Sequence, residues 1–392
     1  MKKILIVLVA IIAAVAIFPY TSLYNFSSGE MNVPIFGKGA GCGNSDIFFN
    51  PALNPSLMFS KENYYVGVGF YGISHRETHS EYIFDTYDNT VGKKNIYDNS
   101  FLYGEPSYIM GYMPIGIVSI SLGYENLISR DYTFRKTCRD DNYVILYDES
   151  EAVIGNINGY FLSVSYKFWR IRTGINLSIL QGDGTSEYSI IYVDPSKTDS
   201  SHSIDEQYSG VRGGLAFTYT FFDNLEMVGI YHVQTIVKNQ VGADYIASDT
   251  NSVAYDIDYI LPNTVGLGIK YSPLNQIPST LMLNAVYEKW SELNGAVIDY
   301  NDIIKYSAGV IHELTSSASL LYGILYEPYK KNNQVVDVGF TGGLTIKYSQ
   351  TEFTISAQYR HLNYEVKKEG SDVPVFYTER VLRLIGDVTI LF

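Results

Sequence analysis

Apolar and polar side chains alternate along most of the chain with a period of two residues. Within 118–125, one set of positions holds Val118, Ile120, Leu122 and Tyr124, and the other holds Ser119, Ser121, Gly123 and Glu125. The same alternation recurs at 162–168, 171–179, 212–220, 336–347 and 353–360. Successive side chains of a β-strand point to opposite faces, so the pattern predicts strands with one apolar and one polar face.

Turn residues divide this region into fourteen predicted strands. They are expected near residues 63–74, 100–113, 116–138, 154–168, 169–183, 206–221, 224–238, 258–271, 278–292, 303–313, 317–329, 335–348, 352–366 and 378–392. The connections after even-numbered strands are short, whereas those at 75–99, 139–153, 184–205 and 239–257 are long and polar. A soluble β-sandwich also alternates, but short turns at one end and long loops at the other are typical of outer-membrane barrels.

The predicted fold class is therefore all-β: a 14-stranded antiparallel transmembrane barrel over residues 63–392. The barrel must close, because an open strand edge in lipid leaves backbone groups without hydrogen bonds. After the first twenty residues no apolar run is long enough for a membrane helix. The abundance of aromatic residues, with 36 Tyr and 19 Phe, suits rings at the membrane interfaces.

The two ends of the chain carry signals for export and assembly. Lys2 and Lys3 precede the apolar stretch 4–18, and Ala14 and Ala16 supply a small-x-small cleavage site. This predicts a signal peptide over 1–16 and a protein of the bacterial outer membrane. The last strand alternates up to Phe392, and the resemblance of this ending to other outer-membrane barrels implies the barrel-assembly machinery as a partner.

Residues 17–62 do not alternate, but they contain recognisable short motifs. These are Asn25-Phe26-Ser27-Ser28-Gly29, a glycine run over 37–43, and the triplet Asn50-Pro51-Ala52 within Phe48 to Pro55. In these motifs and in the layout of its strands, the chain resembles the FadL family of long-chain fatty acid transporters. It departs from the family where an acidic pair is reduced to Asp46 and where the glycine run contains Cys42.

The resemblance implies that residues 17–62 form a hatch inside the barrel, with gating assigned to Asn50, Pro51, Ala52 and Pro55. It also implies that a hydrophobic molecule, a fatty acid or hydrocarbon, is captured at the outer loops and released after the hatch rearranges, often sideways into the membrane. PorV-type barrels carry a similar Asn-Pro-Ala, so a protein-secretion or assembly partner is the alternative function.

Several predicted inward positions are apolar or aromatic, unlike the interior of a water-filled porin. The expected lining of a ligand pocket is Tyr65, Tyr71, Val228, Ile230, Leu321 and Leu325. A register shift of one residue would exchange the two faces, and this alternative is open for the seventh and eleventh strands. Pro106 cannot donate to a strand ladder, so it marks a kink in the wall or precedes the spanning part.

Other chemistry is not indicated by the sequence. The net charge of −13 argues against a nucleic-acid partner. His75, His79 and His202 fall in predicted loops, whereas His232, His312 and His361 fall in strands near no recognisable Ser or Asp motif. No zinc spacing or phosphate-binding glycine loop occurs, so we expect no enzyme, metal or cofactor. Inward Arg172, Arg212, Arg360 and Arg383 are expected to form charge pairs with Glu125, Asp337 and Asp387 that fasten hatch to wall. Two cysteines, Cys42 and Cys138, do not establish a disulfide. A monomer surrounded by outer-membrane lipid is expected.

Overall fold

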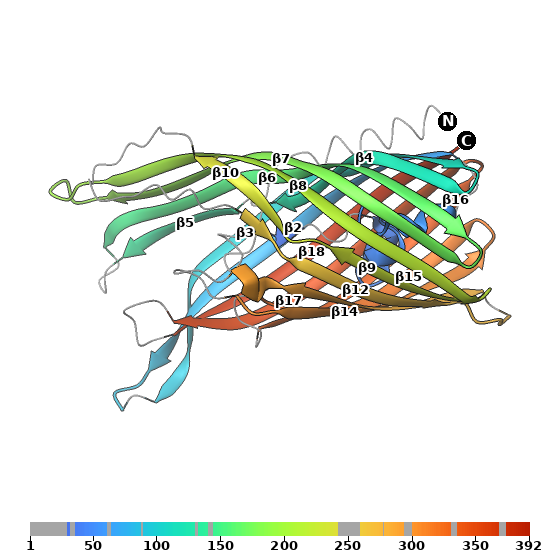
Figure 1. The fold of residues 1–392 in the computed structure, drawn as a ribbon. Helices are drawn as coiled ribbons and strands as arrows, with labels where there is room; N and C mark the ends of the chain where they lie inside the picture. Colours follow the sequence, from blue (N-terminus) through green and yellow to red (C-terminus); the bar gives the residue numbers. More distant parts are fainter. Residues whose placement is uncertain are drawn as a thin grey trace.

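The strands close into a barrel. The computed structural model describes residues 30–31, 36–60, 64–87, 89–129, 132–139, 144–241, 259–276, 278–293, 300–330, 335–367 and 374–392. The last strand, β18 (Pro374–Leu391), pairs antiparallel with the first long strand, β2 (Tyr65–Phe84), and this pairing closes the sheet (Figure 1). The predicted signal peptide, 1–16, lies outside the described residues.

Fourteen strands span the barrel, as the sequence predicted. Three of them are interrupted: β4 (Val118–Ser129) continues in β5 (Tyr132–Arg139), β9 (Leu225–His232) in β10 (Thr235–Val241), and β11 (Tyr259–Leu261) in β12 (Asn263–Tyr271). The others are β2, β3 (Thr90–Ile115), β6 (Ile145–Phe168), β7 (Ile171–Tyr192), β8 (Ser200–Phe222), β13 (Ser279–Lys289), β14 (Ile303–Thr315), β15 (Ala318–Pro328), β16 (Val336–Tyr348), β17 (Thr351–Lys367) and β18.

The prediction of long loops at 75–99, 139–153 and 184–205 is wrong, because most of these residues lie in strands. β2 and β3 continue into a hairpin whose strands are separated only by 85–89, and β7 and β8 are separated only by 193–199. Beyond the membrane the outer face of a strand meets water instead of lipid, so the apolar half of the alternation disappears although the backbone stays extended. The predicted loop at 239–257 begins inside β10, and its residues 242–257 lie outside the described part of the chain.

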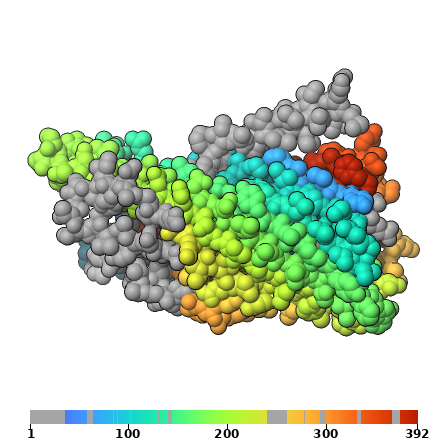
Figure 2. All heavy atoms as spheres, turned by 45° about the horizontal axis from the view of Figure 1, so that its top comes forward, coloured from blue at the N-terminus to red at the C-terminus, as the bar shows by residue number. Residues whose placement is uncertain are grey.

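A belt of exposed apolar side chains covers the outside of the barrel. Leu122, Leu177, Leu267 and Ile355 are each more than half exposed, on four different strands. Figure 2 shows the continuous outer wall that the middle strands form, from cyan through green to orange. Exposed apolar surface of this extent is stable only against lipid. Among the described helices, none is long and apolar enough to cross a membrane.

Residues 36–60 lie inside the barrel, and we call this segment the plug. It contains α2 (Gly37–Gly41) and two 3₁₀ helices, η2 (Asp46–Phe48) and η3 (Pro55–Ser60). α2 contacts β15 to β18, whereas η3 contacts β6, β7 and β8 on another side of the wall. Figure 1 shows the helical part of this segment, in blue, surrounded by strands. A third 3₁₀ helix, η4 (Trp290–Leu293), follows β13.

The wall has a seam between β3 and the β4–β5 strand. Pairing between β3 and β4 extends from Ile115–Val118 to Tyr108–Glu125, and among the described residues it goes no further. The seam opens next to Pro106, where the pairing of β3 with β2 shifts by one residue. This shift is a local irregularity of the ladder within β3, as expected where proline removes a backbone donor, and the kink itself stays a prediction. Within the seam, β4 pairs instead with the short strand β1 (Glu30–Met31).

Candidate functional site: the plug and the inner wall

Backbone atoms of α2 are held by side chains from three neighbouring strands, β16, β17 and β18. The Gly37 amide donates to Oδ2 of Asp387 on β18 at 2.6 Å, and Ser356 Oγ on β17 donates to the Gly37 carbonyl at 2.7 Å. Lys38 Nζ donates to Oε1 of Glu352 at 2.6 Å. A five-residue helix leaves most of its backbone groups without intrahelical partners, so the wall supplies the partners that this helix lacks.

The turn after α2 lies directly on the backbone of the wall. The amide of Gly43 donates to Thr341 Oγ1 at 2.9 Å, and the same hydroxyl donates to the Gly41 carbonyl at 2.8 Å. Gly43 has a φ of +72°, and a Cβ here would lie 2.4 Å from the Ile324 carbonyl oxygen. Only glycine combines this conformation with so close an approach. A glycine of the wall, Gly309, makes a similarly close approach, because a Cβ there would lie 2.4 Å from the Cys42 carbonyl oxygen.

The Asn-Pro-Ala triplet forms a turn that fixes the second half of the plug. Oδ1 of Asn50 accepts from the Ala52 amide at 2.8 Å, as in an Asx-turn, and Ser163 Oγ on β6 donates to the Pro51 carbonyl at 3.1 Å. Ala52 packs with Tyr108, Met110 and Phe161 of the wall. Pro55 lies against Gly174, where a Cβ would come within 2.8 Å of the proline ring.

Asn54 has a role that sequence reasoning missed. Its Nδ2 donates to the Ile47 carbonyl at 2.7 Å, and its Oδ1 accepts from Ser56 Oγ at 2.6 Å. Ser56 Oγ also shares a hydrogen bond of 2.6 Å with Thr218 Oγ1 on β8, and His232 Nε2 donates to the Leu53 carbonyl at 2.8 Å. The signal was present in the sequence, because Asn54-Pro55 repeats Asn50-Pro51 four residues later.

All six predicted lining residues lie on the inner face of the wall. Val228 and Leu321 are each 1% exposed, whereas Tyr231 and Leu320, which face outward on the same two strands, are 40% and 42% exposed. The register of the seventh and eleventh strands is therefore as predicted. The structure brings three of the six together: Val228, Ile230 and Leu321 pack with Cys42, Ile47 and Phe48 of the plug.

The other three lining residues lie elsewhere on the wall. Tyr71 packs near Ala40, Tyr65 packs near Ala52, and Leu325 is buried beside Gly339. The expected function of all six as the lining of a ligand pocket stays a prediction.

The predicted charge pairs lie mainly between strands of the wall. Arg360 forms an ion pair with Asp337 on the neighbouring strand, and Arg172 pairs with Glu226 at 2.6 Å. The expectation that arginines fasten the plug is therefore wrong for these two residues. Acidic groups make those attachments instead, through Asp387 and Glu352, because the plug offers amide and ammonium donors there.

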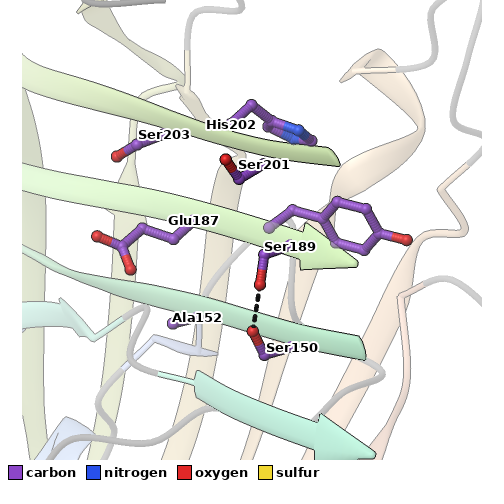
Figure 3. Close-up of a pocket in the computed structure, with 8 residues that line it drawn as sticks. Ser150, Ala152, Glu187, Ser189, Ser201, His202 and Ser203 are labelled. Atoms are coloured by element: carbon purple, nitrogen blue, oxygen red, sulfur yellow. Dashed lines mark hydrogen bonds between the residues drawn. The ribbon is translucent and has the colours of Figure 1, made fainter. Parts of the chain in front are cut away.

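Two of the hollows among the described residues lie outside the plug. One, of about 540 Å³, faces the lipid side and is lined by apolar side chains including Leu281, Leu283 and Phe340. The other, of about 230 Å³, lies where β6, β7 and β8 extend beyond the belt (Figure 3). Ser150 and Ser189 share a hydrogen bond of 2.7 Å in it, and Glu187 lies on the same strand as Ser189. Such a hydroxyl-rich surface does not suit a hydrophobic ligand.

Both cysteines are free thiols. Burial in the plug raises the pKa of the Cys42 thiol to about 12, so it stays protonated and unreactive at neutral pH. Within the described ranges, no group of three or more His, Cys, Asp or Glu side chains is placed to hold a metal ion.

Comparison with solved structures gives the fold a precedent. A Pseudomonas aeruginosa FadL homologue superposes with a TM-score of 0.64 at 14% identity, covering 93% of this chain and 99% of its own. The fold is that of the FadL-like transporters. The Pseudomonas putida toluene transporter TodX matches this FadL-like barrel with a TM-score of 0.60 at 14% identity, covering 96% and 99% of the two chains. The Ralstonia pickettii toluene transporter TbuX superposes with a TM-score of 0.57 at 11% identity, covering 94% of this chain and 100% of its own.

No protein-family model and no curated protein matches the FadL-like chain. The closed 14-strand barrel and its apolar belt are nevertheless those of bacterial outer-membrane proteins.

Proposed function

We propose that this FadL-like barrel carries hydrophobic small molecules across the outer membrane and that the plug is its gate. The observation that carries the proposal is the apolar contact between plug and wall, where Ile47 and Phe48 pack on Val228, Ile230 and Leu321. A porin would keep this cross-section polar and open. Here, movement of the plug would uncover an apolar surface that suits an apolar ligand.

The plug is attached to the wall by hydrogen bonds that are individually weak and can break and re-form. Its two halves are held by separate sets of hydrogen bonds, at Asp387, Ser356 and Thr341 on one side and at Ser163 and Thr218 on the other. Each such bond contributes about 1 kcal/mol net. One half can therefore detach while the other holds, so that Asn50 to Pro55 serve as the gating element.

The seam offers a route from the interior into the lipid. It begins at the level of Tyr108 and Glu125, and Asn126 and Glu105 bridge it through a side-chain hydrogen bond. Separating strands that share a ladder would break many backbone bonds, whereas the seam needs the loss of only side-chain contacts and the short β1 pairing. The ligands we favour are hydrocarbons and fatty acids, since the similar solved structures include a FadL homologue and toluene transporters.

A disulfide between plug and wall tests the gate. In a background with Cys42→Ala and Cys138→Ser, the pair Ser56→Cys and Thr218→Cys replaces two side chains whose oxygens lie 2.6 Å apart. Uptake of radiolabelled toluene and oleate is measured in cells with and without the gene, before and after reduction. We expect oxidised cells to lose uptake and reduced cells to regain it, while Ser56→Cys alone behaves as the background.

Uptake that is unaffected by the disulfide would overturn the gating role of the plug. Uptake that is equal with and without the gene would overturn transport itself. Loss of surface proteins in the deletion strain, with uptake unchanged, would instead establish the PorV-type function in secretion.

A further inference from the structure

Two glutamates face each other inside the barrel, on the last and first strands. Glu77 on β2 is the cross-strand partner of Glu379 on β18, and both side chains are 0% exposed. Like charges directly opposite each other on neighbouring strands are destabilising, and burial adds to that cost. The pair therefore needs partners that offset this cost.

The outward residues at this level place the pair above the lipid. Arg76 and Arg380 are the neighbouring cross-strand partners, and both are exposed. Leu382 and Leu384, further down β18, are 41% and 51% exposed and belong to the apolar belt. The glutamates therefore lie on the long-loop side of the belt, between the plug and the cell surface.

Two histidines and a tyrosine contact the carboxylates. His79 Nε2 is hydrogen-bonded to Oε1 of Glu77, and His75 Nε2 lies 3.2 Å from Oε2 of Glu379. The hydroxyl of Tyr364 donates to Oε1 of Glu379. Oε2 of Glu77 is buried and has no hydrogen-bond partner among the residues that the structure describes. A buried acceptor without a donor is destabilising, and a ligand with a donor would recover that loss.

Aromatic rings surround these polar atoms. The His79 ring lies 4.3 Å from the Tyr377 ring and 4.9 Å from the Tyr97 ring, with Phe134 at 6.2 Å. Tyr364 stacks on Tyr377 at 5.0 Å. These rings come from β2, β3, β5, β17 and β18, so they converge from both sides of the seam.

The aromatic group is continuous with the plug. Tyr132 and Phe134 of β5 pack in one apolar cluster with Ile73, Val381 and Ala40, and Ala40 belongs to α2. A molecule that moves from the surface to the plug along this wall must therefore pass the rings and the paired glutamates.

We propose that Glu77, Glu379 and the surrounding rings form a recognition site for a hydrophobic ligand that carries a hydroxyl group, namely a phenol. Its ring packs beside the aromatic group of Tyr97, Phe134 and Tyr377, between which the His79 ring already lies, in the offset or edge arrangements that aromatic groups prefer. Its hydroxyl donates to Oε2 of Glu77. A ligand carboxylate is repelled by the two acids, and a plain hydrocarbon leaves the acceptor unpaired. The inference rests on the proposed transport function and specifies its ligand class.

Three ligands of matched shape test the site. Binding of 4-methylphenol, toluene and 4-methylbenzoate to the purified full-length protein is measured by calorimetry. We expect 4-methylphenol to bind about tenfold more tightly than toluene, which corresponds to about 1.4 kcal/mol, and 4-methylbenzoate to bind more weakly than either. Glu77→Gln keeps a weaker acceptor and Glu77→Met removes it, so the preference for the phenol should fall in the order wild type, Gln, Met.

The control variant is Glu313→Gln, an exposed glutamate near the short-turn end of β14, which should leave the order of ligands unchanged. Equal affinity for toluene and 4-methylphenol in the wild type would overturn the inference even if the Glu77 variants fail to fold. So would a preference that Glu77→Met retains. Both results leave the transport proposal intact, because toluene uptake with and without the gene tests that separately.

Discussion

At the scale of single residues, the two cysteines differ in how far solvent reaches them. Cys42 is 0% exposed and Cys138 is partly exposed at the far end of β5. Since Cys42 is both shielded and protonated, we expect a maleimide to label the folded protein once per chain, at Cys138. Mass spectrometry after labelling measures this. Cys138→Ser should remove the label, and rapid labelling of that variant would mean that the plug is not seated as described.

The Cys42 thiol also provides a test of the contact between Gly309 and the plug. A Cβ at Gly309 would collide with the backbone and Cβ of Cys42, and overpacking of this kind costs about 1–3 kcal/mol. We expect Gly309→Ala to leave the barrel folded but to increase the labelling rate of Cys42 about tenfold or more. Gly111→Ala is the matched control, because a Cβ there meets nothing within 4 Å. Equal labelling in the two variants would contradict the contact.

Local residue patterns predicted the turn of the plug but not its attachments. Asn50-Pro51 reads as a turn because an Asn side chain can hydrogen-bond the backbone two residues on, and the structure has that bond. The partners of α2 could not be predicted in the same way. Gly37 and Asp387 are 350 residues apart, and their meeting depends on closure of the whole barrel rather than on either local sequence.

At the scale of elements, strand positions followed from alternation and strand ends did not. The lipid-facing parts, such as 171–179, combine a strong apolar face with a polar one, so their register was predictable. The extensions of β2, β3, β7 and β8 beyond the belt carry polar residues on both faces. Periodicity therefore fails where lipid ends, although the ladder continues, as at Thr185–Asp205.

The seam between β3 and β4 gives a prediction at this scale. Glu105 and Asn126 touch across it through their side chains, so Glu105→Cys with Asn126→Cys, in the background without native cysteines, should form a disulfide that holds the two strands together. We expect oxidation to slow toluene uptake several-fold and reduction to restore it. The measurement is initial uptake rate in cells. Unchanged uptake in fully oxidised protein would place the exit elsewhere in the wall.

At the scale of the whole molecule, the strand that closes the barrel also holds the plug inside it. β18 closes the barrel through β2, and the same strand carries Asp387, which holds the first residue of α2, and Glu379, which faces Glu77. The inner face of one strand thus contacts the plug below and the aromatic cluster above. A displacement of β18 relative to the plug would therefore change its contacts with both the plug and the aromatic cluster. For this reason we assign capture and gating to one continuous wall.

The position of the molecule in the membrane can be tested with two arginines. Ile355 on β17 is 60% exposed within the apolar belt, where a lipid-facing arginine costs about 2–4 kcal/mol. Thr378 faces outward on β18 two residues beyond Arg380, above the belt, where the cost is about 0–1 kcal/mol. Reversible unfolding by guanidinium in lipid vesicles measures both variants. Ile355→Arg should lower the free energy of unfolding by the larger amount, because only there must the guanidinium leave water. Equal losses would mean that the belt does not coincide with the hydrocarbon layer, and the level assigned to the glutamate pair would then be wrong as well.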